Sequence, residues 1–247
     1  MKAIMLCAGY ATRLYPLTKN QPKPLLLLAG KPIINYLLEK MGSVSEIDEI
    51  FVVTNEKFYS VFQDWKKKFY PKRAIEIVND QTTNNENRLG AIRDIQFVLK
   101  TKNIQDDILV LASDNYFDFD LKGFVRYSEQ HRPHATVAVY DVQDAGLAKQ
   151  YGLVACNEQG LISAFLEKPE NPTTTLASTG VYFFSKESLP LFDRYLEGHA
   201  NPDAPGYYIK WLVEHEQVFA FSFKGTWYDI GDFESYRKVD SVLQRAI

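Results

Sequence analysis

Residues 2–41 read KAIMLCAGYATRLYPLTKNQPKPLLLLAGKPIINYLLEKM, and they contain the strand, loop and helix that decide the fold. Lys2–Cys7 is a short apolar run that stops at Ala8-Gly9, which is typical of a buried strand. Residues 33–41 place their apolar side chains on one helical face, and Pro32 stands at the position where a helix can begin. The chain therefore opens with a β–loop–α unit.

The same alternation continues up to residue 112. Apolar runs predict further strands, and amphipathic runs between them predict helices. The strands are expected at 50–54, 75–78 and 108–112, and the helices at 58–69 and 88–99. Alternating units of this length indicate an α/β fold: a Rossmann-like, doubly wound, mostly parallel sheet with helices on both faces.

After residue 134 the pattern becomes rich in strands. Runs typical of strands lie at 135–140, 152–156, 161–165, 181–184 and 219–223, and a last helix is expected at 233–246. This order predicts an extension of the sheet and a small β-ribbon that covers one side of a cleft. No Ser/Gly-rich linker divides the chain, so residues 1–247 are expected to form a single domain.

Composition excludes several classes of protein. The 28 basic and 31 acidic residues give a net charge of −3, which argues against a broad nucleic-acid-binding face. No apolar run approaches the roughly 18 residues of a membrane span, and no secretory signal is visible at the start. Two cysteines in 247 residues suit a reducing compartment. We expect a cytoplasmic protein that binds neither nucleic acid nor membrane.

Two cations lie in the loop after the first strand. The planar guanidinium of Arg13 suits phosphate oxygens, and small residues beside it let backbone N–H groups approach an anion. Lys23 lies between Pro22 and Pro24, so the loop is stiff and the side chain is aimed before a ligand arrives. Ligands of an open parallel sheet bind beyond the carboxyl ends of its strands, where this loop lies. The two residues therefore predict a phosphate site.

Two carboxylates are candidate metal ligands. Asp114 is the first charged residue beyond the apolar run 108–112, and Asp229 lies in GTWYDIGD at 225–232. Mg²⁺ favours one or two carboxylates together with substrate phosphates. A turn or helix-capping role is the alternative for each residue taken alone.

Six motifs in order along nearly the whole chain resemble the sugar-phosphate nucleotidyltransferases, especially the short thymidylyltransferase-like and uridylyltransferase-like enzymes. They are AGYATRLYPLTKNQPKPLL (8–26), ASDN (112–115), QYGLV (150–154), LEKP (166–169), STGVYF (178–183) and WYDIG (227–231). This resemblance implies a glycosyltransferase-A-like variant of the fold, with residues 1–134 mainly binding the nucleotide and 135–247 mainly binding the sugar phosphate.

The resemblance also implies a reaction and a role for each matching residue. An NTP and a sugar 1-phosphate would give an NDP-sugar and pyrophosphate with the help of Mg²⁺. Arg13 would hold the β- and γ-phosphates, Lys23 the α-phosphate, and Asp114 with Asp229 the metal. The residues expected to bind the nucleotide are Ala8, Gly9, Tyr10, Ala11, Thr12, Asn84, Asn85, Leu89 and Gly90. Those expected to bind the sugar phosphate are Tyr151, Gly152, Glu167, Lys168, Thr179 and Gly180.

The chain departs from the family pattern in its nucleotide loops. Ala8 and Ala11 stand where many relatives carry glycine, and residues 79–88 are longer than the corresponding segment of thymidylyltransferases. The pair Asn84-Asn85 resembles cytidylyltransferases that act on phosphocholine, so the base and the acceptor stay open. Relatives of this family are often dimers or tetramers, which makes a homo-oligomer an expectation too.

Two other interpretations stay open. Asp118-Phe119-Asp120 after the fourth strand matches the DxD motif of glycosyltransferases, which would use a nucleotide sugar as donor. The same fold could also serve as a non-catalytic nucleotide-sugar-binding regulatory protein. A nucleotidyltransferase needs no general base, because the attacking phosphate oxygen is already ionised near neutral pH; positioning and charge neutralisation suffice.

Overall fold

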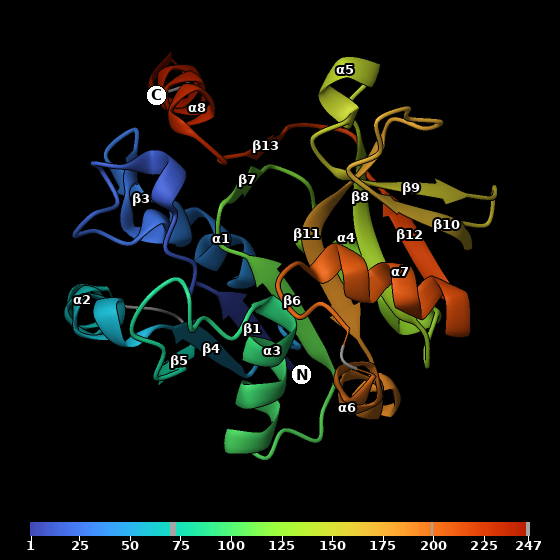
Figure 1. Cartoon of the computed structure of the whole chain (residues 1–247), viewed down its shortest axis with the longest axis horizontal. Helices are drawn as coiled ribbons and strands as arrows, with labels where there is room; N and C mark the ends of the chain where they lie inside the picture. Colours follow the sequence, from blue (N-terminus) through green and yellow to red (C-terminus); the bar gives the residue numbers. More distant parts are fainter. Residues whose placement is uncertain (70–72, 199, 246–247) are drawn as a thin grey trace.

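The computed structural model describes residues 1–69, 73–198 and 200–245, which fold around one large sheet (Figure 1). Its amino-terminal half holds four parallel strands in the order β6–β1–β4–β5. They are β1 (Lys2–Leu6), β4 (Glu49–Thr54), β5 (Ala74–Asn79) and β6 (Ile108–Ala112). Because these strands are parallel, their carboxyl ends lie at the same edge of the sheet.

The other half of the sheet is joined through one long strand, β11 (Leu176–Phe184). It runs antiparallel to β6 and to β8, while β12 pairs parallel with β8. The added strands are β8 (Ala135–Asp141), β9 (Gly152–Cys156), β10 (Ile162–Glu167) and β12 (Val218–Ser222). The predicted α/β fold with a mostly parallel central sheet and an extension after residue 134 is confirmed.

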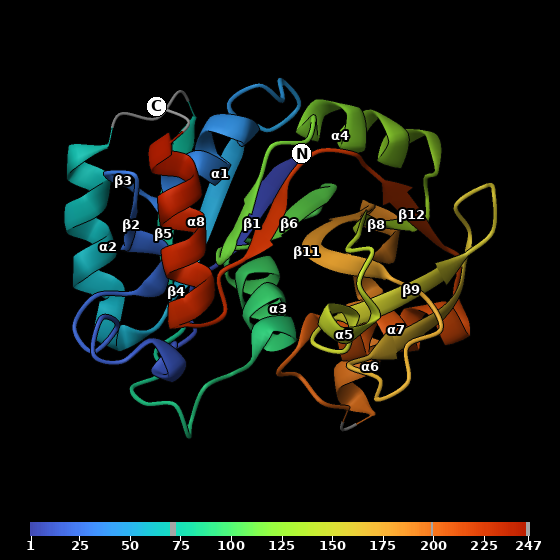
Figure 2. The same cartoon turned by 90° about the horizontal axis from the view of Figure 1, so that it is seen from above.

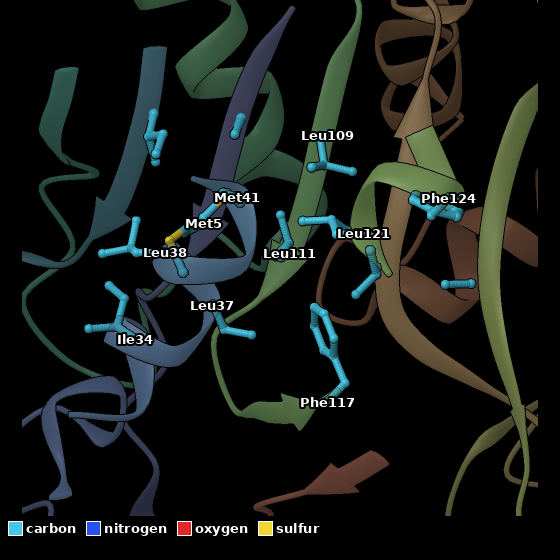
Figure 3. Packing of buried hydrophobic residues seen from close by; sticks show 14 of the residues in the cluster. Met5, Ile34, Leu37, Leu38, Met41, Leu109, Leu111, Phe117, Leu121 and Phe124 are labelled. Atoms are coloured by element: carbon cyan, nitrogen blue, oxygen red, sulfur yellow. The ribbon is translucent and has the colours of Figure 1, made fainter. Parts of the chain in front are cut away.

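Helices cover both faces of the sheet (Figure 2). The first face carries α1 (Ile33–Met41), α2 (Glu56–Lys68) and α4 (Leu121–Gln130), and the second carries α3 (Ala91–Thr101), α6 (Pro190–Glu197) and α7 (Pro205–His215). Successive strand residues point to opposite faces. Met5 and Leu111 therefore pack with α1 and α4, as Figure 3 shows, whereas Ile4 and Val110 pack with α3 and α7.

Further elements gather at the carboxyl edge. They are β2 (Leu27–Leu28), β3 (Lys31–Pro32), β7 (Asn115–Phe117), α5 (Ala145–Ala148), β13 (Trp227–Asp229), α8 (Phe233–Arg245) and the 3₁₀ turns Thr12–Leu14 and Lys23–Leu25. The 3₁₀ turn Lys186–Ser188 lies at the opposite edge, because β11 runs antiparallel to β6 and ends beside Ile108. A third apolar cluster joins Val239 and Leu243 of α8 to Leu14 and Leu28. The last helix thus packs against the loop that follows the first strand.

Three local expectations need correction. Helix α3 begins at Ala91, not at residue 88, because Gly90 at φ +86° leaves the helical conformation just before it. The strand expected at 181–184 begins five residues earlier, at Leu176. Helices α4, α6 and α7 lie in segments where no helix was predicted. Residue 246 of the expected last helix lies outside the described residues.

Within the described residues, no helix combines the length and the apolar character needed to cross a bilayer.

Candidate active site

The two candidate metal ligands are brought together by a strand pair that is remote in sequence. Asp114 directly precedes β7, and β7 pairs antiparallel with β13 so that Asp229 lies opposite Asn115. The backbone N–H of Ile230 donates to the carbonyl of Asp114 at 2.9 Å. The side chain of Trp227 donates to Asn115 Oδ1 at 3.0 Å, which fixes the same pairing. The β7–β13 ribbon therefore places both carboxylates at the carboxyl edge of the sheet.

Lys23 reaches this carboxylate pair from the first loop. Its Nζ donates to Asp114 Oδ2 at 2.9 Å and to the carbonyl of Ile230 at 3.0 Å. Pro22 and Pro24 on either side are buried, and the Lys23 side chain is only 12% exposed. The proline-flanked lysine is thus held against the two segments that carry Asp114 and Ile230.

Arg13 lies beside the second carboxylate. A Cβ added to Gly231 would lie 3.4 Å from Asp229 Oδ2 and 3.7 Å from Arg13 Nη1, so both groups border the same glycine. Arg13 and Asp229 also line the same two cavities. The four charged residues predicted from distant motifs, Arg13, Lys23, Asp114 and Asp229, therefore converge.

The electrostatics of the carboxylate pair suit a cation. Burial opposes ionisation of Asp114, but the neighbouring Lys23 ammonium and its hydrogen bond hold the pKa of this carboxyl below its usual value. Burial and the charge of Asp114 raise the pKa of Asp229 to about 6. The charge of Asp114 disfavours ionisation of Asp229, and a divalent ion held by both carboxylates would remove this opposition. Across the described ranges 1–69, 73–198 and 200–245, no group of three or more His, Cys, Asp or Glu could hold a metal.

The six residues predicted to bind the sugar phosphate share one cavity of about 230 Å³. Tyr151, Gly152, Glu167, Lys168, Thr179 and Gly180 line it together with Arg13, Asp114 and Asp229. A second cavity of about 480 Å³ adjoins it and is bounded by Lys238 of α8. The backbone of Lys168 is held at φ +46°, and its N–H donates to the carbonyl of Tyr151 at 3.1 Å.

Glycines make room for the carboxylate in this cavity. A Cβ on Gly152 would lie 3.0 Å from Glu167 Oε2, and a Cβ on Gly206 would lie 1.9 Å from the same oxygen. Burial raises the pKa of Glu167, and the adjacent Lys168 partly offsets this rise. The Thr179 hydroxyl donates to the carbonyl of Ala138 at 2.9 Å, so its buried side chain serves the β11–β8 pairing as well as the wall.

The loop after β1 presents backbone to solvent. Ala11 adopts the left-handed conformation at φ +47° that glycine adopts most readily, and Thr18 Oγ1 donates to its carbonyl at 2.7 Å. Gly9 and Thr12 are exposed, and a Cβ on Gly9 would meet nothing within 4 Å. Tyr10 is buried instead, with its hydroxyl donating to Thr82. The backbone of Ala11 thus takes the left-handed conformation that glycine favours, despite its methyl group.

The loop between β5 and α3 holds the other predicted nucleotide contacts. Asn84 and Asn85 are exposed, and Asn84 Oδ1 accepts the backbone N–H groups of Glu86 at 2.9 Å and Asn87 at 3.1 Å. The carbonyl of Asn85 accepts a hydrogen bond from Arg88. Leu89 is half-buried, and Gly90 ends the loop. The Asn84 side chain stabilises the loop, and a contact with a base stays a prediction.

Sequence reasoning missed several residues of the site. Trp227, Asn115, Gln150, Ser178, Tyr182 and Gly206 all line the 230 Å³ cavity. Trp227 belongs to the motif at 227–231, but its bond to Asn115 could not be read from the sequence because the partners are 112 residues apart. Gly206 lies in the segment PDAPGY (202–207), for which no prediction was made from the sequence.

The DxD segment serves local structure. Asp118 Oδ1 accepts the backbone N–H of Thr226 at 2.7 Å, and a Cβ on Gly225 would lie 2.3 Å from the same oxygen. Asp120 caps α4 by accepting the N–H of Lys122 at 3.0 Å. Because these carboxylates hold the connection to β13 and the start of a helix, the glycosyltransferase interpretation loses its main support.

Comparison with known proteins agrees with the motifs. The chain is 31% identical over 236 residues to the bifunctional protein GlmU of Methanocaldococcus jannaschii, covering 94% of this chain and 51% of that protein. It is 26% identical over 233 residues to the mannose-1-phosphate guanylyltransferase catalytic subunit beta of Drosophila melanogaster, covering 93% of this chain and 59% of that protein. The chain thus spans a little over half the length of these relatives.

The fold also matches solved structures. A UDP-glucose pyrophosphorylase complexed with UDP-glucose superimposes with a TM-score of 0.81 at 21% sequence identity, covering 100% of this chain and 99% of that one. The family model described as nucleotidyl transferase matches residues 2–245. With this match over almost its entire length, the chain belongs to the nucleotidyl transferase family.

Proposed function

We propose that the protein is a Mg²⁺-dependent nucleotidyltransferase that joins an NTP and a sugar 1-phosphate to give an NDP-sugar and pyrophosphate. The observation that carries this proposal is the convergence of Lys23, Asp114, Asp229 and Arg13 beside a cavity that contains Glu167 and Lys168. Arg13 and Lys23 on one side of the cavity suit phosphate groups. Glu167 and Lys168 on the other side suit the hydroxyl groups and the phosphate of a sugar 1-phosphate.

The reaction proposed is an in-line displacement. A phosphate oxygen of the sugar 1-phosphate attacks the α-phosphorus of the NTP, a new P–O bond forms, and the bond to the β-phosphate oxygen breaks. The electron pair leaves with pyrophosphate. Because both reactants are polyanions, the site must mainly neutralise and align charge. Mg²⁺, when held by Asp114 and Asp229, supplies further positive charge at the phosphate oxygens.

In this proposal, four side chains of the site bind the two substrates. The Lys23 ammonium lies 2.9 Å from Asp114, the carboxylate expected to hold the metal. When substrates bind, this ammonium leaves Asp114 and binds the α-phosphate, which would lie beside the metal. Arg13 holds the departing pyrophosphate at the neighbouring rim. Lys168 binds the acceptor phosphate, and Glu167 accepts hydrogen bonds from sugar hydroxyls. None of the four histidines is needed for proton transfer.

Pyrophosphate release tests the proposal. The purified protein is incubated with Mg²⁺ and each of ATP, CTP, GTP, UTP and dTTP, against a panel of sugar 1-phosphates and phosphocholine. Release that requires both a nucleotide and a sugar 1-phosphate supports the proposal. Release with CTP and phosphocholine alone would assign the cytidylyltransferase alternative, and no release with any pair would favour the non-catalytic alternative.

A further inference from the structure

One segment, residues 200–206, contacts both sides of the cleft. On one side it meets the loop that joins β5 to α3, which is expected to face the nucleotide. On the other side it leads into α7, which packs against β10 (Figure 1). Strand β10 ends at Glu167, in the cavity assigned to the acceptor. The segment therefore connects the two substrate sides directly.

A two-pronged ion pair ties the loop to this segment. Arg88 Nε lies 2.8 Å from Asp203 Oδ1 and Arg88 Nη2 lies 2.9 Å from Asp203 Oδ2. The guanidinium also donates through Nη1 to the carbonyl of Asn85 at 2.8 Å, so it binds its own loop and the opposite segment. Two parallel hydrogen bonds fix both the orientation of the guanidinium relative to the carboxylate and the distance between them.

Backbone contacts complete the junction. The N–H of Ala91 donates to the carbonyl of Asp203 at 3.2 Å, and the N–H of Ile92 donates to that of Pro202 at 3.0 Å. These two N–H groups belong to the first turn of α3 and have no partner within the helix. A Cβ on Gly90 would lie 2.6 Å from the carbonyl oxygen of Pro202. The first turn of α3 therefore packs directly against residues 202–203, and no side chain larger than that of glycine fits at position 90.

Three residues further on, the segment forms part of the acceptor cavity. Gly206 lies so close to Glu167 that a Cβ there would lie 1.9 Å from its carboxylate oxygen. A shift of the segment therefore moves the wall against which Glu167 rests. The Arg88 and Asp203 side chains are 40% and 49% exposed, and ion pairs of such exposure add about 1 kcal/mol or less to folding. Removing this pair should leave the fold intact.

We propose that Arg88 and Asp203 are positioning residues that couple the two substrate sites by holding the β5–α3 loop against the segment beside Glu167. This inference rests on the proposed function for its assignment of the two sites. A nucleotide that orders the loop then also orders the wall of the acceptor cavity. By linkage, each substrate strengthens the binding of the other by the same factor. Neither residue touches the reacting phosphorus.

The kinetic test compares Arg88→Met, Asp203→Asn and the double variant, using the NTP and sugar 1-phosphate that release pyrophosphate fastest. At saturating NTP, we expect each single variant to raise the KM for the sugar 1-phosphate at least fivefold, while kcat stays within threefold. The double variant should match Arg88→Met, because the ion pair between Arg88 and Asp203 is already lost in that single variant. An unchanged KM, or a double variant whose loss is the product of the two single losses, would overturn the proposal.

A matched control comes from the same helix. Lys100 near the other end of α3 pairs with Asp193 of α6 at 2.8 Å, so Lys100→Met also removes an ion pair between α3 and the second half of the chain. It lies far from the cleft and should leave the KM unchanged. A rise equal to that of Arg88→Met would mean that any loosening of α3 suffices, which would also overturn the proposal.

Hydrogen exchange of the ligand-free protein tests the junction independently of any reaction. In Arg88→Met, amide exchange should rise both in residues 82–92 and in residues 203–206, whereas Lys100→Met should leave both segments unchanged. Unaltered exchange at 203–206 in Arg88→Met would refute the junction even if pyrophosphate release is found. Conversely, absent pyrophosphate release in the wild-type protein would remove the proposed function and, with it, the assignment of the coupled sites.

Discussion

Two buried carboxyl groups behind the nucleotide-side loop make stability depend on pH. Asp80, directly after β5, and Asp94, in the first turn of α3, are each 5% exposed and adjoin each other. Asp80 Oδ1 accepts the N–H and the hydroxyl of Thr82, both at 2.7 Å, but Asp80 Oδ2 and Asp94 Oδ1 have no hydrogen-bond donor among the described residues. Burial and the missing donors therefore favour a proton on this pair in the folded protein.

The magnitude follows from the pKa of Asp94. Burial, followed by the neighbouring Asp80 carboxyl, raises this pKa from 3.8 to about 8. One pKa unit corresponds to about 1.4 kcal/mol, so this difference limits the effect on the free energy of unfolding to about 6 kcal/mol. The folded state keeps a proton that the unfolded chain loses above about pH 4. Stability from this group is therefore full below pH 4 and is lost as the pH rises to about 8.

Asp94→Asn removes the titration while keeping the shape. The amide can donate to Asp80 at every pH, which replaces the shared proton. We expect the free energy of unfolding in urea to fall between pH 5 and 9 in the wild-type protein, and to fall by at least 2 kcal/mol less in Asp94→Asn. Asp64→Asn, at an exposed ion pair on α2, serves as the control and should keep the wild-type slope. Equal slopes in Asp94→Asn and the wild-type protein would refute the shared proton.

Three further predictions concern the cleft. Lys23→Ala should keep the fold and lower kcat about 10²–10³-fold because one aimed cation is lost, and a loss below threefold in pyrophosphate release would remove Lys23 from the mechanism. Asp114→Asn should raise the Mg²⁺ concentration needed for half-maximal activity, so an unchanged titration would count against Asp114 as a metal ligand. Gly206→Ala should raise the KM for the sugar 1-phosphate at least tenfold, since its methyl group would meet Glu167 Oε2 at 1.9 Å. The control Gly198→Ala places a methyl group 3.5 Å from a carbonyl and should be silent.

Local patterns predicted the parallel half of the fold closely. Helix α1 begins and ends where its apolar spacing and Pro32 indicated, because the residues that face the core recur on one side of a single helix. The start of α3 was misplaced by three residues for a physical reason: the carbonyl groups of Pro202 and Asp203 cap it from a distant segment. No periodicity within residues 88–99 records such a partner.

The candidate site shows the same division between local and distant information. Ordered motifs named Arg13, Lys23 and both carboxylates, and the structure gathers them. The motifs did not disclose that Asp118 would stabilise a turn, since its partner Thr226 is 108 residues away. They also left the acceptor wall at Gly206 unseen, because a glycine is informative only when its neighbours in space are known.

The way in which the carboxylates meet has a consequence for the assembly of the site. Asp229 reaches Asp114 only when β13 pairs with β7, and this short ribbon is held by the bonds from Ile230 to Asp114 and from Trp227 to Asn115. Lys23 then bonds to the residue that precedes β7, at Asp114, and to the residue that follows β13, at the carbonyl of Ile230. Because the cation bridges these two segments, it lowers the repulsion that would otherwise oppose bringing the second carboxylate close. The residue proposed to act on the α-phosphate therefore also helps to build the site in which it acts.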